Sequence, residues 1–196
     1  MKSYNYAVAW ILVFLLAAHL AVVDSYAWYL DSISQLAAQA YSRAWIMRTG
    51  FIGFGLLVQV AGTSRMRSAG SKWYREIPIV LYGLCILLSG IFSAEPFLEG
   101  VPYSTPEARL HGIFATAAGI ALVAATLVYA LTDEPASRQR VHWSALLAIT
   151  GISLLFGSLP AVAGATQRLL WAAGFAWLLY LGTGRPGFYS EGKTAG

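Results

Sequence analysis

Three arginines stand near the start of apolar segments that have the length of membrane helices. Arg48, Arg109 and Arg168 each fall in the first turn of such a segment. A cation there opposes the positive end of the helix dipole, at a cost of about 0.3–1 kcal/mol. An anion is therefore expected nearby, and it has two possible sources. Either an external phosphate or carboxylate binds there, or the arginines form ion pairs within the protein, because charges in a membrane usually pair with one another. The internal candidates are Asp31, Glu95, Glu99 and Glu107.

Two histidines lie at similar depths in the first and fourth apolar segments. His19 precedes Asp24 by five residues, and His111 follows Arg109 by two. Such a pair could ligate a haem, or bind a metal together with a carboxylate such as Asp24. The ordinary alternative is a pair of hydrogen-bonded interior histidines, and no spacing demands a macrocycle. We therefore predict no cofactor and no metal site, and keep haem or a divalent metal as an alternative. The third histidine, His142, is expected to reach out to the membrane surface.

A serine, an aspartate and a histidine raise the question of catalysis. Ser34, Asp31 and His111 could act as nucleophile, orienting group and base at one membrane surface. No nucleophile-elbow sequence surrounds Ser34, and serine is common at helix caps. The sequence also contains no Walker loop, zincin motif or CxxC pair. Whether the protein is an enzyme stays open.

The elements that position these residues are predicted from six apolar runs. A membrane-spanning helix needs about 20 apolar residues, and the six runs meet or approach this length. The prediction is an all-α bundle of six transmembrane helices in one domain over residues 1–183, with spans at about 4–23, 44–62, 77–93, 109–131, 143–160 and 167–183. Five spans are conceivable, but one apolar segment would then have no place in the membrane.

Composition favours a membrane protein and opposes nucleic-acid binding. Of the 196 residues, 58% are hydrophobic and 11% are charged, against about 25% charged in soluble domains. The net charge of +4 comes from lysines and arginines in short connections, which is a topology signal. Nine of the thirteen fall on the side of both termini. The positive-inside rule therefore predicts cytoplasmic termini, with a cytoplasmic tail at 184–196.

The connection between the first two spans predicts a short amphipathic helix that lies on, or is tucked into, the outer face of the bundle. Ser32 and Gln35 have the spacing of a capping box. Ile33 and Leu36 begin an apolar face that continues to Tyr41. Separately, the fourth span is rich in small residues such as Gly112 and Gly119. Because small residues let membrane helices approach closely, we expect the fourth span to be central in the bundle.

Three short motifs resemble a known family. They are Asp31–Leu36, Gly90–Pro96 and Leu110–Gly112. Together they resemble the prokaryotic membrane proteins grouped as domain of unknown function 998 (DUF998), which are distantly similar to the six-span Frag1/DRAM/Sfk1 proteins. The resemblance implies six spans and an outward cluster formed by the Asp31/Ser34 segment, the Glu95 loop and His111. Family members tend to carry an Asp at the position of Glu95. The resemblance brings an architecture and no reaction.

The leading expectation is a multi-pass protein of the bacterial inner membrane with an outward-facing polar pocket. The pocket would bind a lipid headgroup or a small amphipathic anion through Asp31, Ser34, Arg48, Glu95, Arg109, His111 and Arg168. Its partners would be membrane lipids, with an oligomer or a partner subunit possible. Two alternatives remain: a non-catalytic structural or accessory subunit, and a haem or metal redox protein that uses His19 and His111.

Overall fold

The protein is all-helical in its computed structural model, which describes residues 4–22, 25–68, 72–98 and 100–183. Three short 3-10 helices accompany the α-helices, namely η1 (Ile33–Ala37), η2 (Trp73–Arg75) and η3 (Pro160–Val162). The described residues include no β-strand, and one isolated bridge joins Ala38 to Ala94. The predicted all-α class is confirmed. The α-helices are α1 (Tyr4–Leu20), α2 (Ala44–Met66), α3 (Ile77–Ile91), α4 (Thr105–Thr132), α5 (Ala136–Ser158) and α6 (Ala163–Thr183).

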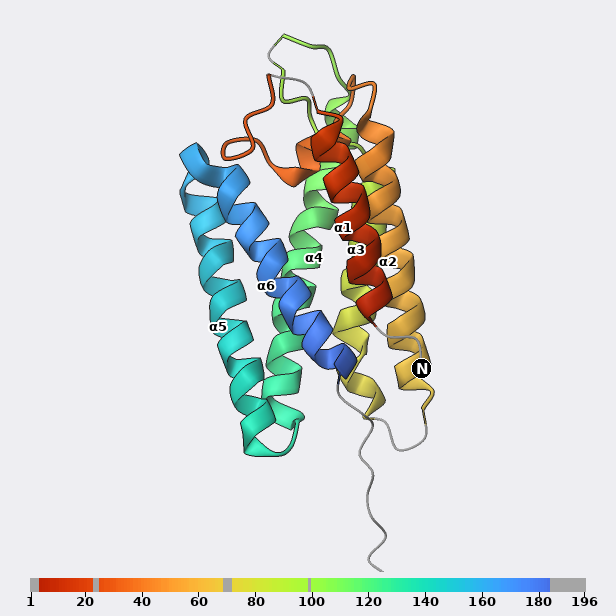
Figure 1. The fold of residues 1–196 in the computed structure, drawn as a ribbon, viewed down its shortest axis with the longest axis vertical. Helices are drawn as coiled ribbons and strands as arrows, with labels where there is room; N and C mark the ends of the chain where they lie inside the picture. Colours follow the sequence, from red (N-terminus) through yellow and green to blue (C-terminus); the bar gives the residue numbers. More distant parts are fainter. Residues whose placement is uncertain (1–3, 23–24, 69–71, 99, 184–196) are drawn as a thin grey trace, which may run out of the picture.

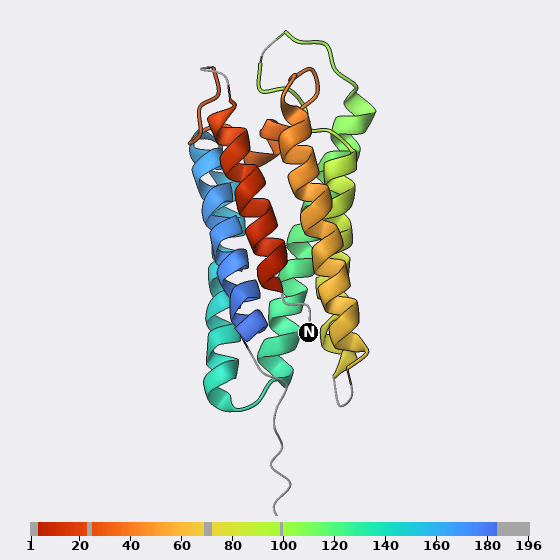
Figure 2. The ribbon, with the colours of Figure 1, turned by 45° about the vertical axis from the view of Figure 1, so that its right-hand side comes forward.

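The helices run side by side with alternating direction (Figures 1 and 2). Each packs against its neighbours in chain order, and α6 returns to contact α1. One end of the bundle, here called the upper end, carries the connections α1–α2 and α3–α4. The opposite, lower end carries the α2–α3 and α4–α5 connections and the first and last described residues (Figure 1).

Four segments are long and apolar enough to cross a membrane: Ala44–Met66, Trp73–Ile91, Thr105–Thr132 and Ala136–Ser158. The first helix is apolar but has 17 residues, about 25 Å at 1.5 Å per residue. Large apolar side chains also remain exposed on the helix surfaces, among them Ile120 at 67% and Leu147 at 72%. A bilayer would solvate such surface, so the fold is that of a membrane-like helical protein. The predicted number of six spans stays an expectation.

Glycines bring the backbones of α2 and α3 close together, whereas the glycines of α4 do not bring it close to a neighbour. A Cβ added to Gly55 would lie 2.4 Å from the carbonyl oxygen of Gly83, which is a backbone atom and cannot rotate away. By contrast, a Cβ at Gly112 or Gly119 would meet no atom within 4 Å. The glycines of α4 therefore leave open space, which corrects the expectation that they bring helices together. A small residue in a helix can allow either close helix packing or an open space, and the neighbouring sequence does not show which of the two occurs.

Substituting Gly55 with alanine should destabilise the bundle by about 1–3 kcal/mol, the usual cost of adding volume to a packed site. The added methyl group would force α2 and α3 apart. Thermal unfolding in detergent, followed by circular dichroism, measures the loss. The control is Gly151→Ala on α5, where a Cβ has open space and alanine favours the helix. Equal stability of the two variants would contradict close α2–α3 packing.

The predicted amphipathic helix is a shorter and more buried element. The backbone N–H of Ser32 donates to Oε1 of Gln35 at 2.8 Å, as one half of a capping box. Regular structure ends at Ala37, because Ala38 is extended and Ala40 takes a left-handed φ of 56°. Ile33, Leu36 and Ala37 are buried in the core. The element is therefore a 3-10 turn tucked into the upper end, and it is shorter than the predicted helix.

Candidate functional site

Two of the three arginines, Arg48 and Arg168, bind groups other than the expected anions. α4 and α6 start four residues before the predicted spans, and α2 starts at Ala44 as predicted, so that all three arginines lie in the second turn of their helices. Arg48 donates to the carbonyl oxygens of Gly90 and Ile91 at 3.2 and 2.8 Å. These carbonyls end α3, where helical hydrogen bonding stops and acceptors remain unused. Arg48 thus joins α2 to the end of α3.

Arg168 closes the other side of the upper end. Its Nη1 donates to the carbonyl oxygens of Trp28, Asp31 and Gly164 at 2.5, 3.0 and 2.8 Å. Its Nη2 donates to the hydroxyl of Tyr26 at 2.6 Å. The bond to Gly164 lies within α6, and the bonds to Tyr26, Trp28 and Asp31 fix the α1–α2 connection to α6. The carboxylate of Asp31 accepts a local bond from the Ala27 N–H at 2.6 Å, and none of the recorded salt bridges of the described residues joins it to Arg168.

His19 is also committed to this structure. Arg168 Nη2 lies 2.9 Å from Nε2 of His19, and a guanidinium can only donate. Nε2 is therefore the acceptor, and the proton lies on Nδ1, which donates to the Leu15 carbonyl at 2.8 Å. Because both ring nitrogens are engaged, a haem or metal bond to His19 would break one of these contacts. Asp24, its suggested partner, lies outside the described residues. Among those that are described, no group of three His, Cys, Asp or Glu side chains is placed to hold a metal.

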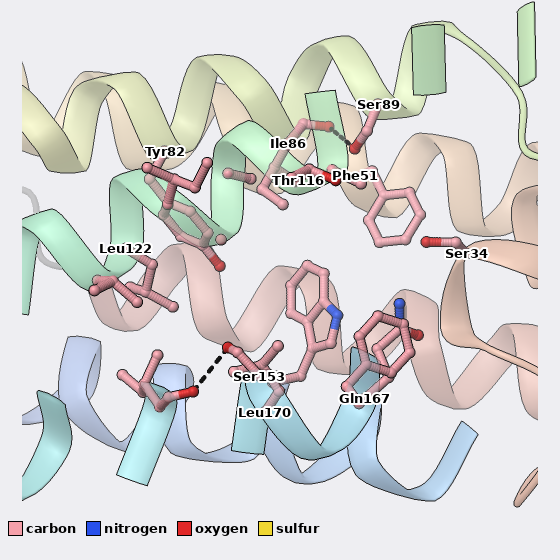
Figure 3. Close-up of a pocket in the computed structure, with 18 residues that line it drawn as sticks. Ser34, Phe51, Tyr82, Ile86, Ser89, Thr116, Leu122, Ser153, Gln167 and Leu170 are labelled. Atoms are coloured by element: carbon pink, nitrogen blue, oxygen red, sulfur yellow. Dashed lines mark hydrogen bonds between the residues drawn. The ribbon is translucent and has the colours of Figure 1, made fainter. Parts of the chain in front are cut away.

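Two adjoining cavities occupy the space between α2, α3, α4, α5, α6 and η1. The deeper one has a volume of about 420 Å³ and a mostly apolar wall that includes Phe51, Leu122, Ile149 and Trp171. We call this space the deep cavity. Figure 3 shows its side chains, with the Ser34 hydroxyl turned into it from η1.

The second space, here called the mouth, has a volume of about 540 Å³ and lies at the upper end. Its wall contains four of the seven predicted site residues. The other three are not wall residues: Asp31, Arg48 and Arg168. The mouth and the deep cavity share five wall residues, which makes them parts of one passage: Ser34, Ala115, Thr116, Phe156 and Gln167. The predicted site residues in the mouth are Ser34, Glu95, Arg109 and His111.

Polar groups of the mouth are only partly used by the protein. Arg109 is exposed, and no hydrogen bond or ion pair of its side chain is recorded with the residues described. Glu95 accepts a long bond of 3.4 Å from the Tyr103 hydroxyl. Gln167 accepts the Ile33 N–H at 2.6 Å through Oε1, which leaves its amide nitrogen toward the cavity (Figure 3). The mouth therefore offers both donors and acceptors to a ligand.

Gln39 holds the rim of the mouth in place. Its backbone N–H donates to the Ala94 carbonyl at 3.0 Å. Its side-chain amide exchanges bonds with the Ser104 backbone, donating at 3.0 Å and accepting at 2.8 Å. Residues that follow η1 are thereby tied to both ends of the α3–α4 connection. The sequence contained no signal for this role, because the acceptor and donor are backbone groups.

The lower end contains a buried network that the sequence did not predict. Glu76 is 4% exposed at the start of α3. It accepts bonds from the hydroxyls of Tyr4 and Tyr129 and pairs with Arg65, whose Nε lies 2.7 Å from its Oε1. Four helices thus meet at one carboxylate. Both carboxylate oxygens of Glu76 accept bonds from the protein and the group is buried, so we interpret the cluster as a structural clamp.

Asp133, next to it, forms a second clamp between α4 and α5. Its carboxylate accepts from Arg75 at 3.0 Å, and from Arg138 and His142 at 2.9 Å each. Burial alone would raise the pKa of Asp133, but the His142 hydrogen bond and the two arginine charges outweigh it and lower that pKa below its ordinary value. Asp133 is therefore held ionised.

His142 is fully buried, which corrects the expectation that it reaches the membrane surface. The indole N–H of Trp177 donates to its Nδ1 at 3.0 Å. Since indole is a donor only, Nδ1 carries a lone pair, and the proton on Nε2 is donated to Asp133. A chain Asp133–His142–Trp177 thus crosses from the α4–α5 connection to α6. The lower end is consequently more than a set of loop charges.

Comparison with known proteins identifies a family for the chain but no individual relative. A family profile described as "Protein of unknown function (DUF998)" matches residues 6–184. No curated protein and no solved structure matches the chain significantly. The matched range covers all six helices apart from the first two described residues.

Proposed function

The chain belongs to the DUF998 family, whose function is not established, and from this premise we propose that it is an integral membrane protein that binds an amphiphile. The charged or polar headgroup of the ligand would occupy the mouth, and its apolar part would occupy the deep cavity. The observation that carries the proposal is the wall shared by the two cavities. A passage that is polar at one end and apolar at the other matches an amphiphile better than a wholly polar solute.

The mouth also has a group suited to an anionic headgroup. Arg109 lies on the cavity wall. Of Arg48, Arg109 and Arg168, it is the one whose guanidinium has no hydrogen bond or ion pair to the described part of the protein. Guanidinium groups bind phosphate and carboxylate strongly, often through two parallel bonds. Glu95 is the other charged residue of the wall, so the lining is neutral overall. This balance fits a phosphate-containing headgroup better than a polyanion.

From the positive-inside bias of the sequence we infer that the mouth faces the outer side of the membrane. The ligand would then enter from the outer leaflet of a bacterial inner membrane.

The test is retention of lipid by the purified protein when the deep cavity is filled. Gly119 lies on its wall, and a side chain there has open space. Gly119→Phe should displace about two methylene groups of the ligand, each worth about 0.8 kcal/mol. Retained lipid, measured by native mass spectrometry and lipid extraction, should then fall by about tenfold.

The matched control is Gly151→Phe on α5. Gly151 also has open space for a side chain, but it is not a wall residue of either cavity. This variant should retain as much lipid as the unmodified protein. Equal retention by the unmodified protein and Gly119→Phe, at equal folded yield, would contradict binding in the deep cavity.

The alternative of an accessory subunit has less support. Its expected mark is an apolar surface that a partner helix covers, and α5 does expose Leu147 and Leu154. A bilayer covers such a surface equally well, since α5 is itself long and apolar enough to cross it. The binding proposal accounts for the passage formed by the mouth and the deep cavity, and the accessory role does not.

A further inference from the structure

One polar atom of the mouth is buried without a partner. His111 is 5% exposed and lies on the wall of the mouth. Its Nε2 has no hydrogen-bond partner among the residues that the structure describes. An unpaired buried polar atom is unfavourable by about 1–3 kcal/mol, so a ligand that satisfies it gains the corresponding affinity.

The other ring nitrogen fixes what kind of partner Nε2 needs. Nδ1 lies 2.7 Å from the Ser89 carbonyl oxygen and 2.9 Å from that of Phe92. Carbonyl oxygens only accept hydrogen bonds, so Nδ1 carries the proton. In the neutral imidazole, Nε2 then holds a lone pair and can only accept. Among the residues that the structure describes, no carboxylate forms a salt bridge with His111, so none of them would balance a charge on the buried ring.

A second acceptor faces the same space. Glu95 is on the wall of the mouth, and its one recorded bond is the 3.4 Å contact from Tyr103. Arg109 provides donors for a phosphate, but it cannot satisfy the headgroup's own donors. The mouth therefore combines a cation for phosphate with two acceptors that need hydrogen-bond donors.

We propose that the headgroup bound in the mouth is a phosphodiester that carries a hydrogen-bond donor, a hydroxyl or an ammonium group, and that Nε2 of His111 accepts from it. His111 is then a specificity-determining residue of the site. The inference rests on the proposed amphiphile-binding function. The two donor groups share this chemistry, and lipid pairs of equal charge separate their contribution from that of charge.

The probes are four phospholipids with matched acyl chains, offered in nanodiscs. Phosphatidylglycerol and phosphatidylmethanol have the same charge, and only the former carries headgroup hydroxyls. Phosphatidylethanolamine and phosphatidylcholine are both zwitterionic, and only the former has N–H donors. The donor-bearing lipid of at least one pair should be retained about three- to tenfold better, as expected for one hydrogen bond. The pair that shows this preference identifies the donor as a hydroxyl or an ammonium group.

Two variants of His111 test the atom itself. His111→Asn places an amide nitrogen near the position of Nδ1, which preserves the donor to Ser89 and Phe92 but removes the acceptor at Nε2. The preference within the pair should vanish while thermal stability is retained. His111→Gln places an acceptor near the position of Nε2 and should keep part of the preference, with lower stability because the carbonyls lose their donor.

The outcomes separate this inference from the function on which it rests. If all four lipids are retained but neither pair shows a preference, amphiphile binding stands and the donor inference is overturned. If no lipid is retained above the level of Gly119→Phe, the proposed function itself fails. A preference that survives unchanged in a folded His111→Asn variant would assign the acceptor role elsewhere and overturn the role of His111.

Discussion

Replacing Glu76 with glutamine is expected to destabilise the bundle by about 3 kcal/mol or more, the range measured when one partner of a buried ion pair is removed. Arg65 would stay largely inside the protein, with its side chain 21% exposed, and would lose the charge that balances it. The bonds from Tyr4 and Tyr129 would also weaken, because a neutral amide oxygen is a poorer acceptor than a carboxylate. Thermal or denaturant unfolding in detergent measures the change.

Glu134→Gln is the matched control, since Glu134 is an exposed glutamate at the same lower end and the change of charge is identical. It should leave stability within about 0.5 kcal/mol of the original. A second variant tests the cause. Glu76→Leu combined with Arg65→Met removes both charges and should be more stable than Glu76→Leu alone, because no unpaired charge remains. If the double variant is the less stable one, the clamp acts through packing and not through the ion pair.

The general architecture could be predicted because it depends on properties that the sequence displays directly. Long apolar runs with charges confined to the connections predict helices in a membrane-like bundle. The ends of these helices were harder to predict. α4 begins at Thr105, before the apolar run, since Ser104 and Pro106 favour a helix start. α5 begins at Ala136, seven residues before its predicted span. Hydropathy alone predicts the apolar segment that would lie in a membrane, and it does not predict where the helix begins or ends.

The candidate site was predicted in part, for a physical reason. Ser34, Glu95, Arg109 and His111 were grouped because ionisable and polar residues at one membrane depth are costly unless used. The same argument included Arg48 and Arg168, but most of their partners are carbonyl oxygens. Every residue has such an oxygen, so residue types do not reveal which arginines it will satisfy. Glu99 lies outside the described residues.

The lower network escaped prediction because its members are far apart in the chain. Glu76 and Asp133 look like ordinary loop carboxylates, and only the fold brings Tyr4, Tyr129 and His142 to them. One signal was available in principle. The tyrosines and the histidine stand within one turn of the predicted inner ends of their helices, at the depth of the two carboxylates. The lysines and arginines there were attributed wholly to topology, whereas Arg65, Arg75 and Arg138 also form ion pairs.

Reversing the charge of Arg109 should produce the largest loss of binding. Hydrogen bonds to charged groups contribute about 1.5–3 kcal/mol, and because Arg109 is exposed the lower end of that range applies. Arg109→Glu should therefore reduce retention of every phosphate-containing lipid by about tenfold. Arg109→Lys keeps the charge but loses the paired donors, so its lipid retention should lie between those of the unmodified protein and Arg109→Glu. Native mass spectrometry of the proteins after exchange into lipid nanodiscs measures this order.

Arg140→Glu is the control, because Arg140 is an exposed arginine at the lower end and its reversal changes the net charge equally. Its lipid retention should stay unchanged. Thermal stability should also be unchanged in Arg109→Glu, since the side chain has no recorded bond to the described residues. Together with His111→Asn, the variant divides the mouth into two functions: Arg109 sets affinity for the phosphate, and His111 sets preference among headgroups. An equal loss in Arg140→Glu would instead assign the effect to overall charge, and the mouth would then have no part in it.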